Sequence, residues 1–351
     1  MVVATFALFH DVLFLKFKIM TLQTADSIVP TIDVASYLKD PSSSEAKGVV
    51  DAVRDACKKT GFCQVTGHGL SPKLQKELLA ASEKFFALGD NQKRELDART
   101  TVGRRGYDVL ASQAYDDGSF TDLKEGFYVG HNIPLYDEVV KQKRFFMGPN
   151  VWPNASILSG EEFRRPVEAY FHAIHGLSLS ILKLVAATLP YGPDVFKDFT
   201  VGHTVAVLRM LHYPPMPPTQ SMDGRKQFGA GAHTDFGAIT LLLQDDNPGL
   251  EVLDPKTNEF VAVDPSPNAF VFNVGDMLSF WTSGEYKSSV HRVINKAPRD
   301  RYSAAFFYDG ALDCPLVPLS ESNESSGGGD VLTVEKHMIK RITESYGAKT
   351  E

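Results

Sequence analysis

The sequence predicts an α+β protein in which helices flank a barrel or a jelly roll. Helical patterns dominate the first 200 residues, whereas from about residue 203 the pattern changes to short apolar strands separated by turn clusters. About eight short strands at such spacing are typical of barrels and jelly rolls. The length of 351 residues and the 43% apolar content are sufficient for a large buried core.

The N-terminal elements follow in order. Residues 29–37 are expected to form a strand, and residues 44–60 a helix with one apolar face. The apolar run 61–70 ends in glycines and reads as a buried strand. Ser71-Pro72 has the cap-then-proline order that opens a helix, which we place at 73–87.

The remaining elements lie on either side of residue 200. A loop-rich stretch covers about 98–160, and a long amphipathic helix, 161–189, ends at a Pro/Gly cluster. Residues 316–330 are rich in Ser and Gly and look mobile, and a last helix is expected at 332–346. The predicted strands are 204–213, 238–244, 250–253, 259–263, 269–273, 278–281, 289–294 and 302–308.

Composition excludes several classes of protein. The net charge of −7 gives no support for nucleic-acid binding. The three cysteines are far apart and lack CxxC spacing, which indicates thiols in a reducing compartment such as the cytoplasm. Residues 1–20 are apolar but interrupted by charges, so we expect residues 1–26 to be an artefactual or mobile extension with no stable membrane insertion.

His233, Asp235 and His291 form a candidate metal site. His233 and Asp235 are two residues apart just before a predicted strand, so both side chains can face one ion. His291, in another strand, is the best third ligand. Two histidines and one carboxylate are the facial triad of non-haem iron(II) oxygenases. Histidines in strands are more often structural than ligands, so these residues alone leave a structural role open.

Arg301 and Ser303 form a candidate carboxylate site ten residues beyond His291. At i, i+2 spacing they share one face of the predicted strand. The planar guanidinium matches a carboxylate, and the hydroxyl adds a second donor. Because a buried arginine needs an anion, a dicarboxylate that bridges Arg301 and the metal would satisfy both. The alternative is an ordinary surface arginine beside Asp300.

The motifs HTDFGAITLLLQD, NVGDML, YKSSVHRV and RYSAAFF resemble those of iron(II)/2-oxoglutarate dioxygenases of the isopenicillin N synthase-like type. VPTIDVASYL, GFCQVTGHGL, RGY and DLKEGF extend the resemblance over about 29–312. The resemblance implies a double-stranded β-helix (jelly roll) core flanked by helices. It assigns the iron to His233, Asp235 and His291, and 2-oxoglutarate to Arg301, Ser303 and Tyr213.

The resemblance also implies an organisation into segments. After the extension 1–26 we expect an N-terminal dioxygenase domain at 27–150 and a connecting helix at 151–200. The jelly-roll domain is expected at 201–315, and a mobile segment with a C-terminal helix at 316–351.

The implied activity is oxidation of a small molecule, most simply hydroxylation, coupled to decarboxylation of 2-oxoglutarate, with Fe(II) as cofactor and O2 and 2-oxoglutarate as co-substrates. No catalytic residue beyond the metal centre is required. The sequence is most similar to fungal polyketide-tailoring members, as in the citrinin and tropolone pathways, which oxidise an aryl methyl group. Two positions depart from patterns common in the family: Leu211 replaces an asparagine, and Phe280 a basic residue.

The candidate substrate contacts are an arginine in the predicted strand 204–213 and several residues close to the motifs. Arg209 shares a strand face with Tyr213 and could meet an acidic substrate group, or could pair with an acid such as Glu125. The aromatic candidates are as readily explained as core. The full set is Arg209, Phe236, Tyr107, Arg105 and Trp281.

Three alternatives remain beside the leading hypothesis. An iron oxidase that does not use 2-oxoglutarate would hold its substrate with Arg301 and Ser303. A zinc hydrolase with the same triad would work without O2. A non-catalytic ligand binder on this fold has no support from the motifs, because no triad position is lost.

Overall fold

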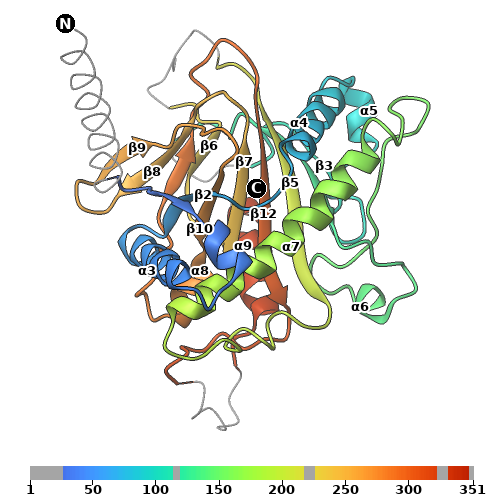
Figure 1. The fold of residues 1–351 in the computed structure, drawn as a ribbon. Coiled ribbons are helices and arrows are strands. Elements are labelled where there is room, and N and C mark those ends of the chain that lie inside the picture. The colour runs from blue at the N-terminus through green and yellow to red at the C-terminus, as the bar shows by residue number, and fades with distance from the viewer. Residues whose placement is uncertain (1–26, 114–118, 217–225, 322–330, 348–351) are drawn as a thin grey trace, which may run out of the picture.

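The computed structural model describes residues 27–113, 119–216, 226–321 and 331–347 and contains two facing β-sheets with helices on the outer side of one (Figure 1). The expectations for residues 1–26 lie outside the described residues. The sheets form the expected jelly-roll core, and the helices complete an α+β fold.

The larger sheet contains strands from both halves of the chain. β12 lies near its middle, antiparallel to both β5 and β7, and β1 pairs with β2 in parallel. Strands from before residue 150 therefore form both edges of this sheet, and the jelly-roll strands form its centre. The expected domain boundaries at 150 and 200 stay a prediction. In order, the strands are β1 (Thr31–Asp33), β2 (Phe62–Thr66), β10 (Phe270–Val274), β7 (Ile239–Gln244), β12 (Arg301–Ala311), β5 (Thr204–Tyr213), β4 (Glu125–Gly130) and β3 (Gly106–Asp108).

The smaller sheet is antiparallel throughout and carries two of the expected metal ligands. Its strands, in order, are β6 (Ala230–His233), β11 (His291–Val293), β8 (Leu250–Asp254) and β9 (Glu259–Ala262).

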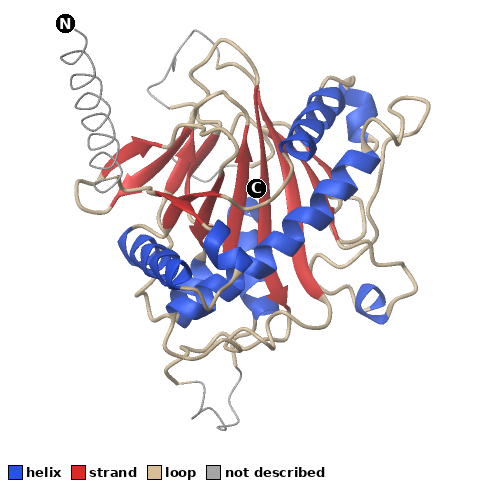
Figure 2. Ribbon diagram, viewed as in Figure 1, coloured by secondary structure: helices blue, strands red, loops and turns tan. Residues whose placement is uncertain are grey.

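The main helices begin where the sequence supplies caps. The Ser43 hydroxyl accepts a hydrogen bond from the amide of Ala46, and the Ser71 hydroxyl accepts one from the amide of Lys73 ahead of Pro72. Figure 2 shows α3, α4 and α7 on one side of the larger sheet. The helices are α2 (Ala35–Lys39), α3 (Ser44–Lys59), α4 (Pro72–Phe86), α5 (Asp90–Arg94), α6 (Glu138–Lys141), α7 (Arg164–Thr188), α8 (Asp276–Trp281) and α9 (Val334–Gly347).

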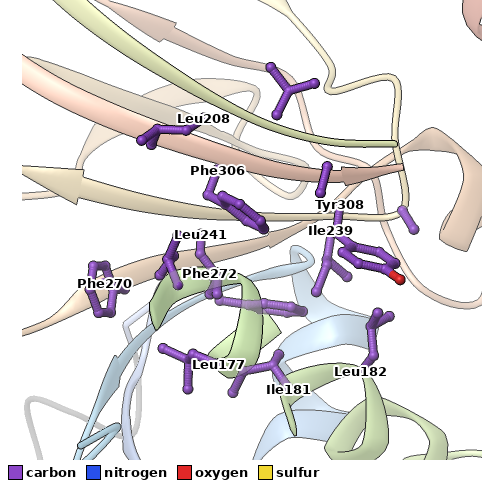
Figure 3. Packing of buried hydrophobic residues seen from close by; sticks show 14 of the residues in the cluster. Leu177, Ile181, Leu182, Leu208, Ile239, Leu241, Phe270, Phe272, Phe306 and Tyr308 are labelled. Carbon is purple, nitrogen blue, oxygen red and sulfur yellow. The ribbon is translucent and has the colours of Figure 1, made fainter. Parts of the chain in front are cut away.

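The layer between α7 and the larger sheet is an apolar core. Leu177 and Ile181 of α7 lie against side chains of the central strands, among them Phe306 of β12 (Figure 3). Because side chains alternate along a strand, the even-numbered residues of β12 face α7 and the odd-numbered ones face the space between the sheets. One strand thus serves both the core and the site.

The structure corrects three predicted elements. Residues 278–281 belong to helix α8, because apolar residues in a short run carry no reliable periodicity. The stretch 98–160 contains strands β3 and β4 and helix α6, and β4 pairs with β5. The predicted strand 29–37 is a shorter strand followed by helix α2.

In the described part of the chain, α7 alone is long and apolar enough to cross a membrane by length and composition. Its most apolar window is 56% buried inside the protein, as expected for a core helix. Its contacts with α3, α4 and the larger sheet account for this apolar character.

Candidate metal centre and substrate cavity

Strand pairing brings the three predicted metal ligands together. β11 runs antiparallel to β6, and its register places His291 opposite His233. Asp235 follows in the loop that leads into β7. The Oδ1 atom of Asp235 lies 4.0 Å from Nε2 of His233 and 3.7 Å from Nε2 of His291. The three ligand atoms lie within 4.8 Å of one another, a spacing that suits a single ion.

Neighbouring groups orient each ligand toward that point. Nδ1 of His233 donates to the carbonyl oxygen of Gly231 at 2.7 Å, and Nδ1 of His291 to that of Ser289 at 3.2 Å. Each imidazole lone pair therefore sits on Nε2. The Oδ2 atom of Asp235 accepts hydrogen bonds from two donors, so Oδ1 is turned to the histidines. These donors are Thr240 Oγ1 at 2.6 Å and Asn273 Nδ2 at 2.7 Å.

The protonation states also suit a metal. Burial, followed by the nearby His291, holds the pKa of His233 well below its ordinary value, so this imidazole is neutral. Burial opposes ionisation of Asp235, but the adjacent histidines and the two donors outweigh it and lower its pKa. A neutral imidazole and an ionised carboxylate are forms that bind a divalent ion, so His233 and Asp235 fit the iron that the sequence implies.

Arg301 and Ser303 have the properties expected of a carboxylate site. Arg301 is fully buried, and its described partners are the carbonyl of Asn247 at 3.1 Å and the amide oxygen of Gln244 at 2.8 Å, neither of them an anion. Its Nη1 atom and the Ser303 hydroxyl are buried without a hydrogen-bond partner. Since such donors are costly to bury unpaired, they fit an incoming carboxylate.

Tyr213 lies beside this pair, as the resemblance implies. Its ring centroid is 5.0 Å from Cζ of Arg301, and β5 and β12 are in register at these two residues. The side chain is buried and lines the same cavity. The expected 2-oxoglutarate residues are therefore brought together at one end of β12.

A cavity between the sheets joins the metal ligands to the arginine. It holds about 1080 Å³ of space not filled by atoms, part of it open to solvent. Much of its wall is apolar and aromatic, which suits a small apolar ligand with a few polar groups. Beside the metal and carboxylate residues it is lined by Phe145, Phe146, Phe236, Phe307, Val207, Met338 and Ile342, and by the polar residues Gln113, Lys124, Arg209 and Asp309.

Two of the five predicted substrate contacts lie in this wall. Phe236 follows Asp235 directly, and Arg209 projects from β5. The Nη2 atom of Arg209 forms a buried ion pair with Asp108 and donates to Gln113 Oε1 at 3.2 Å. The partner suggested by the sequence, Glu125, instead contacts other groups.

Arg105, Tyr107 and Trp281 lie outside the cavity lining, so the structure offers no support for the expectation that they contact substrate. Arg105 donates to the carbonyl oxygens of Gly103 and Phe146 and so ties two loops together. The Tyr107 hydroxyl donates to Glu125, and the Trp281 indole donates to a backbone carbonyl. Sequence proximity to a motif did not reveal that these side chains contact other parts of the protein rather than the cavity.

Sequence reasoning missed several residues that line the cavity. Lys124, paired with Asp122 at 2.6 Å, comes from the segment before β4. Asp309 shares the odd-numbered face of β12 with Arg301, a signal that the alternation could have supplied. Met338 and Ile342 belong to α9, which only the fold brings over the cavity.

Family models match both halves of the chain. The model described as the 2OG-Fe(II) oxygenase superfamily matches residues 204–310. The model described as the N-terminal region of non-haem dioxygenases in morphine synthesis matches residues 29–155. The first match includes the metal triad, Arg301 and Ser303.

The chain is also similar to individual dioxygenases of known name and to solved structures. The 2-oxoglutarate-dependent dioxygenase citB of Monascus ruber is 50% identical over 95% of this chain and 100% of its own. Clavatol oxidase claD of Penicillium crustosum is 45% identical over 91% of this chain and 96% of its own. The crystal structure of a full-length Neurospora crassa protein in complex with alpha-KG superposes with a TM-score of 0.73 at 26% identity, covering 90% of this chain and 96% of that one.

Proposed function

Because this chain belongs to the 2OG-Fe(II) oxygenase superfamily, we propose that His233, Asp235 and His291 hold its iron and that Arg301, Ser303 and Tyr213 hold its 2-oxoglutarate. The protein is a 2-oxoglutarate-dependent dioxygenase. The observation that carries the residue assignment is the buried, unpartnered Nη1 of Arg301, which faces the same cavity as the triad.

When bound, iron and 2-oxoglutarate supply the oxidising chemistry, in which O2 converts 2-oxoglutarate to succinate and CO2 while a C–H bond of the second substrate is oxidised. The residues of the chain bind and orient. Thr240 and Asn273 fix the Asp235 carboxylate, and Arg301 anchors the carboxylate of the co-substrate. The aromatic wall excludes water and positions the second substrate.

We propose as substrate a small, oxygenated aromatic metabolite of polyketide origin, hydroxylated at an aryl methyl or another C–H bond. Two features support this. The relatives with 45 to 50% identity include a clavatol oxidase, and the cavity combines a largely aromatic wall with a few polar groups. The free thiols Cys57, Cys63 and Cys314 suit the reducing cytoplasm, where we expect the enzyme to work.

The test is incubation of the purified enzyme, Fe(II), 2-oxoglutarate and O2 with methyl-substituted dihydroxybenzaldehydes and dihydroxyacetophenones. We expect succinate and a product heavier by one oxygen atom to form in equal amounts with at least one compound. Succinate production that no compound stimulates would contradict the substrate class. Product without succinate would contradict the role of 2-oxoglutarate and favour an oxidase that does not use it.

A further inference from the structure

Asp309 is a buried carboxyl group for which the proposed mechanism has no use. Its side chain is 3% exposed and lines the cavity. Its Oδ1 atom is buried without a hydrogen-bond partner. A carboxyl group in such a place is costly unless something else binds it.

The strand places this carboxyl at the metal end of the cavity. β12 runs antiparallel to β7, with Ser303 opposite Gln244 and Tyr308 opposite Ile239. From the arginine end, the odd-numbered face of β12 therefore passes along β7 to the loop that carries the metal ligand Asp235. A Cβ atom added to Gly237, two residues beyond the ligand Asp235, would lie 1.8 Å from Oδ1 of Asp309. The backbone at Gly237 thus packs directly against this carboxyl.

A local irregularity of β12 determines the position of Asp309. The pairing with β5 shifts register between Tyr308 and Gly310, which leaves Asp309 as the extra residue of a bulge. Gly310 has a φ of 69°, and a Cβ atom there would lie 2.0 Å from the ring of Phe199. Bulges of this kind re-aim a side chain near active sites, and here the side chain belongs to Asp309.

Apart from Arg301 and the metal ligand Asp235, the other charged groups of the cavity wall differ from Asp309, because each has an internal counter-charge. Arg209 pairs with Asp108, and Lys124 pairs with Asp122. No ion pair joins Asp309 to a cation within the described residues. Burial therefore leaves the Asp309 carboxyl in need of a hydrogen-bonding group from a ligand.

We propose that Asp309 is a specificity-determining residue whose carboxyl group accepts a hydrogen bond from a ring hydroxyl of the substrate and so fixes which C–H bond lies at the metal end. This inference rests on the proposed function, since it takes an oxygenated aromatic as the second substrate. An apolar ring would leave the Asp309 carboxyl buried and unpaired, so the same residue would select against unoxygenated compounds.

The test compares Asp309→Leu and Asp309→Asn with the wild-type enzyme on a dihydroxybenzaldehyde that the wild type oxidises. For Asp309→Leu we expect the KM for the aromatic to rise about 10- to 100-fold, the loss expected for one or two buried hydrogen bonds. Succinate formed per product should also rise, because a poorly held substrate uncouples the two oxidations. Asp309→Asn keeps the shape and a hydrogen-bonding group, so its KM should change less.

Two readouts separate this role from a structural one. The KM for 2-oxoglutarate should stay within about twofold of wild type in both variants, because Arg301 lies at the other end of β12. A substrate analogue in which one ring hydroxyl is replaced by hydrogen should lose the same factor with wild type, and little more with Asp309→Leu. The matched control is Asp246→Asn, whose side chain is 83% exposed on the surface.

An unchanged KM for the aromatic in both Asp309 variants, with wild-type coupling, would overturn the proposal. Wild-type enzyme that forms no substrate-stimulated succinate with any oxygenated aromatic would instead overturn the proposed function, and this inference with it. The two failures are distinguishable because only the second is seen without a variant.

Discussion

The two ends of the cavity are built in different ways. The cofactor end is made of side chains at i, i+2 spacing on strands or directly after a strand, whereas the substrate end combines strands, loops and the C-terminal helix. At the cofactor end, Nη1 of Arg301 and the Ser303 hydroxyl are buried without a hydrogen-bond partner. At the substrate end, Lys124 and Arg209 form ion pairs within the protein. We define the cofactor end as His233, Asp235, His291, Arg301, Ser303 and Tyr213, and the substrate end as Lys124, Arg209, Phe236, Asp309, Met338 and Ile342.

The cofactor end depends on the geometry of the strands, and the substrate end depends on how other segments pack against them. Strand periodicity and strand pairing orient most residues of the cofactor end, and Asp235 follows β6 by two residues, so short local motifs specify the chemistry. The substrate end depends on how α9 and the segment before β4 pack against the sheets. Changes at the cofactor end should therefore abolish the reaction, and changes at the substrate end should alter stability or selectivity.

The largest effect is expected for His233→Ala. Loss of one of three protein ligands should abolish stable iron binding and lower kcat/KM by a factor on the order of 10³ or more. The measurement is an anaerobic titration with Fe(II) and 2-oxoglutarate that follows the metal-to-ligand charge-transfer absorption. His203→Ala, at an exposed position, is the control. The same absorption in His233→Ala as in wild type would contradict the metal assignment.

Arg301→Ala should come next. Removal of the buried guanidinium should raise the KM for 2-oxoglutarate about 10²- to 10³-fold, since truncating a buried charged partner costs roughly 2–5 kcal/mol. Iron binding should persist, because the triad is untouched. The variant should also lose its preference for 2-oxoglutarate over 2-oxobutyrate, which lacks the distal carboxylate. Exposed Arg299→Ala is the control, and a retained preference would argue against this role.

Residues whose positions depend on local spacing could be predicted from the sequence, whereas residues placed by long-range contacts could not. The triad and Arg301-x-Ser303 could be found because both depend on residue spacing within strands. The sequence did not show that Trp281 belongs to helix α8, because the short apolar run before it has no clear periodicity, or that the Tyr107 hydroxyl donates to Glu125. The partner of Arg209 could not be predicted either, since Asp108 is 101 residues away in sequence.

A variant of Arg209 tests the idea that the cations of the substrate end are occupied internally. Arg209→Leu should lower the free energy of unfolding by roughly 3–5 kcal/mol, because the cation paired with the buried Asp108 is lost. The double variant Arg209→Leu/Asp108→Leu should regain much of this stability in urea denaturation. If the double variant is as unstable as the single one, the ion pair is not the reason.

The same double variant decides whether Arg209 also binds substrate. A KM for the aromatic close to wild type would assign Arg209 to the support of β5 and leave Asp309 as the main polar contact. An increase of about tenfold or more in a stable double variant would place a direct contact at Arg209, and the contrast between the two ends would then be smaller.

The smallest effect is expected at Arg341 of α9, which contacts the residues on either side of the metal ligand Asp235. Its guanidinium donates to the Thr234 hydroxyl at 3.0 Å, pairs with Asp276 at 3.0 Å and lies 4.5 Å from the ring centroid of Phe236. Because the side chain is 30% exposed, Arg341→Ala should cost only about 1 kcal/mol of stability.

The effect of Arg341→Ala on activity should lie in the substrate rather than the co-substrate. We expect the KM for the aromatic to rise about three- to tenfold, as α9 and its residues Met338 and Ile342 loosen over the cavity. Lys340→Ala, on the exposed face of the same helix, is the control. A larger change in the KM for 2-oxoglutarate would mean that α9 acts through Thr234 on the metal ligands, and would join the two ends into one cooperative unit.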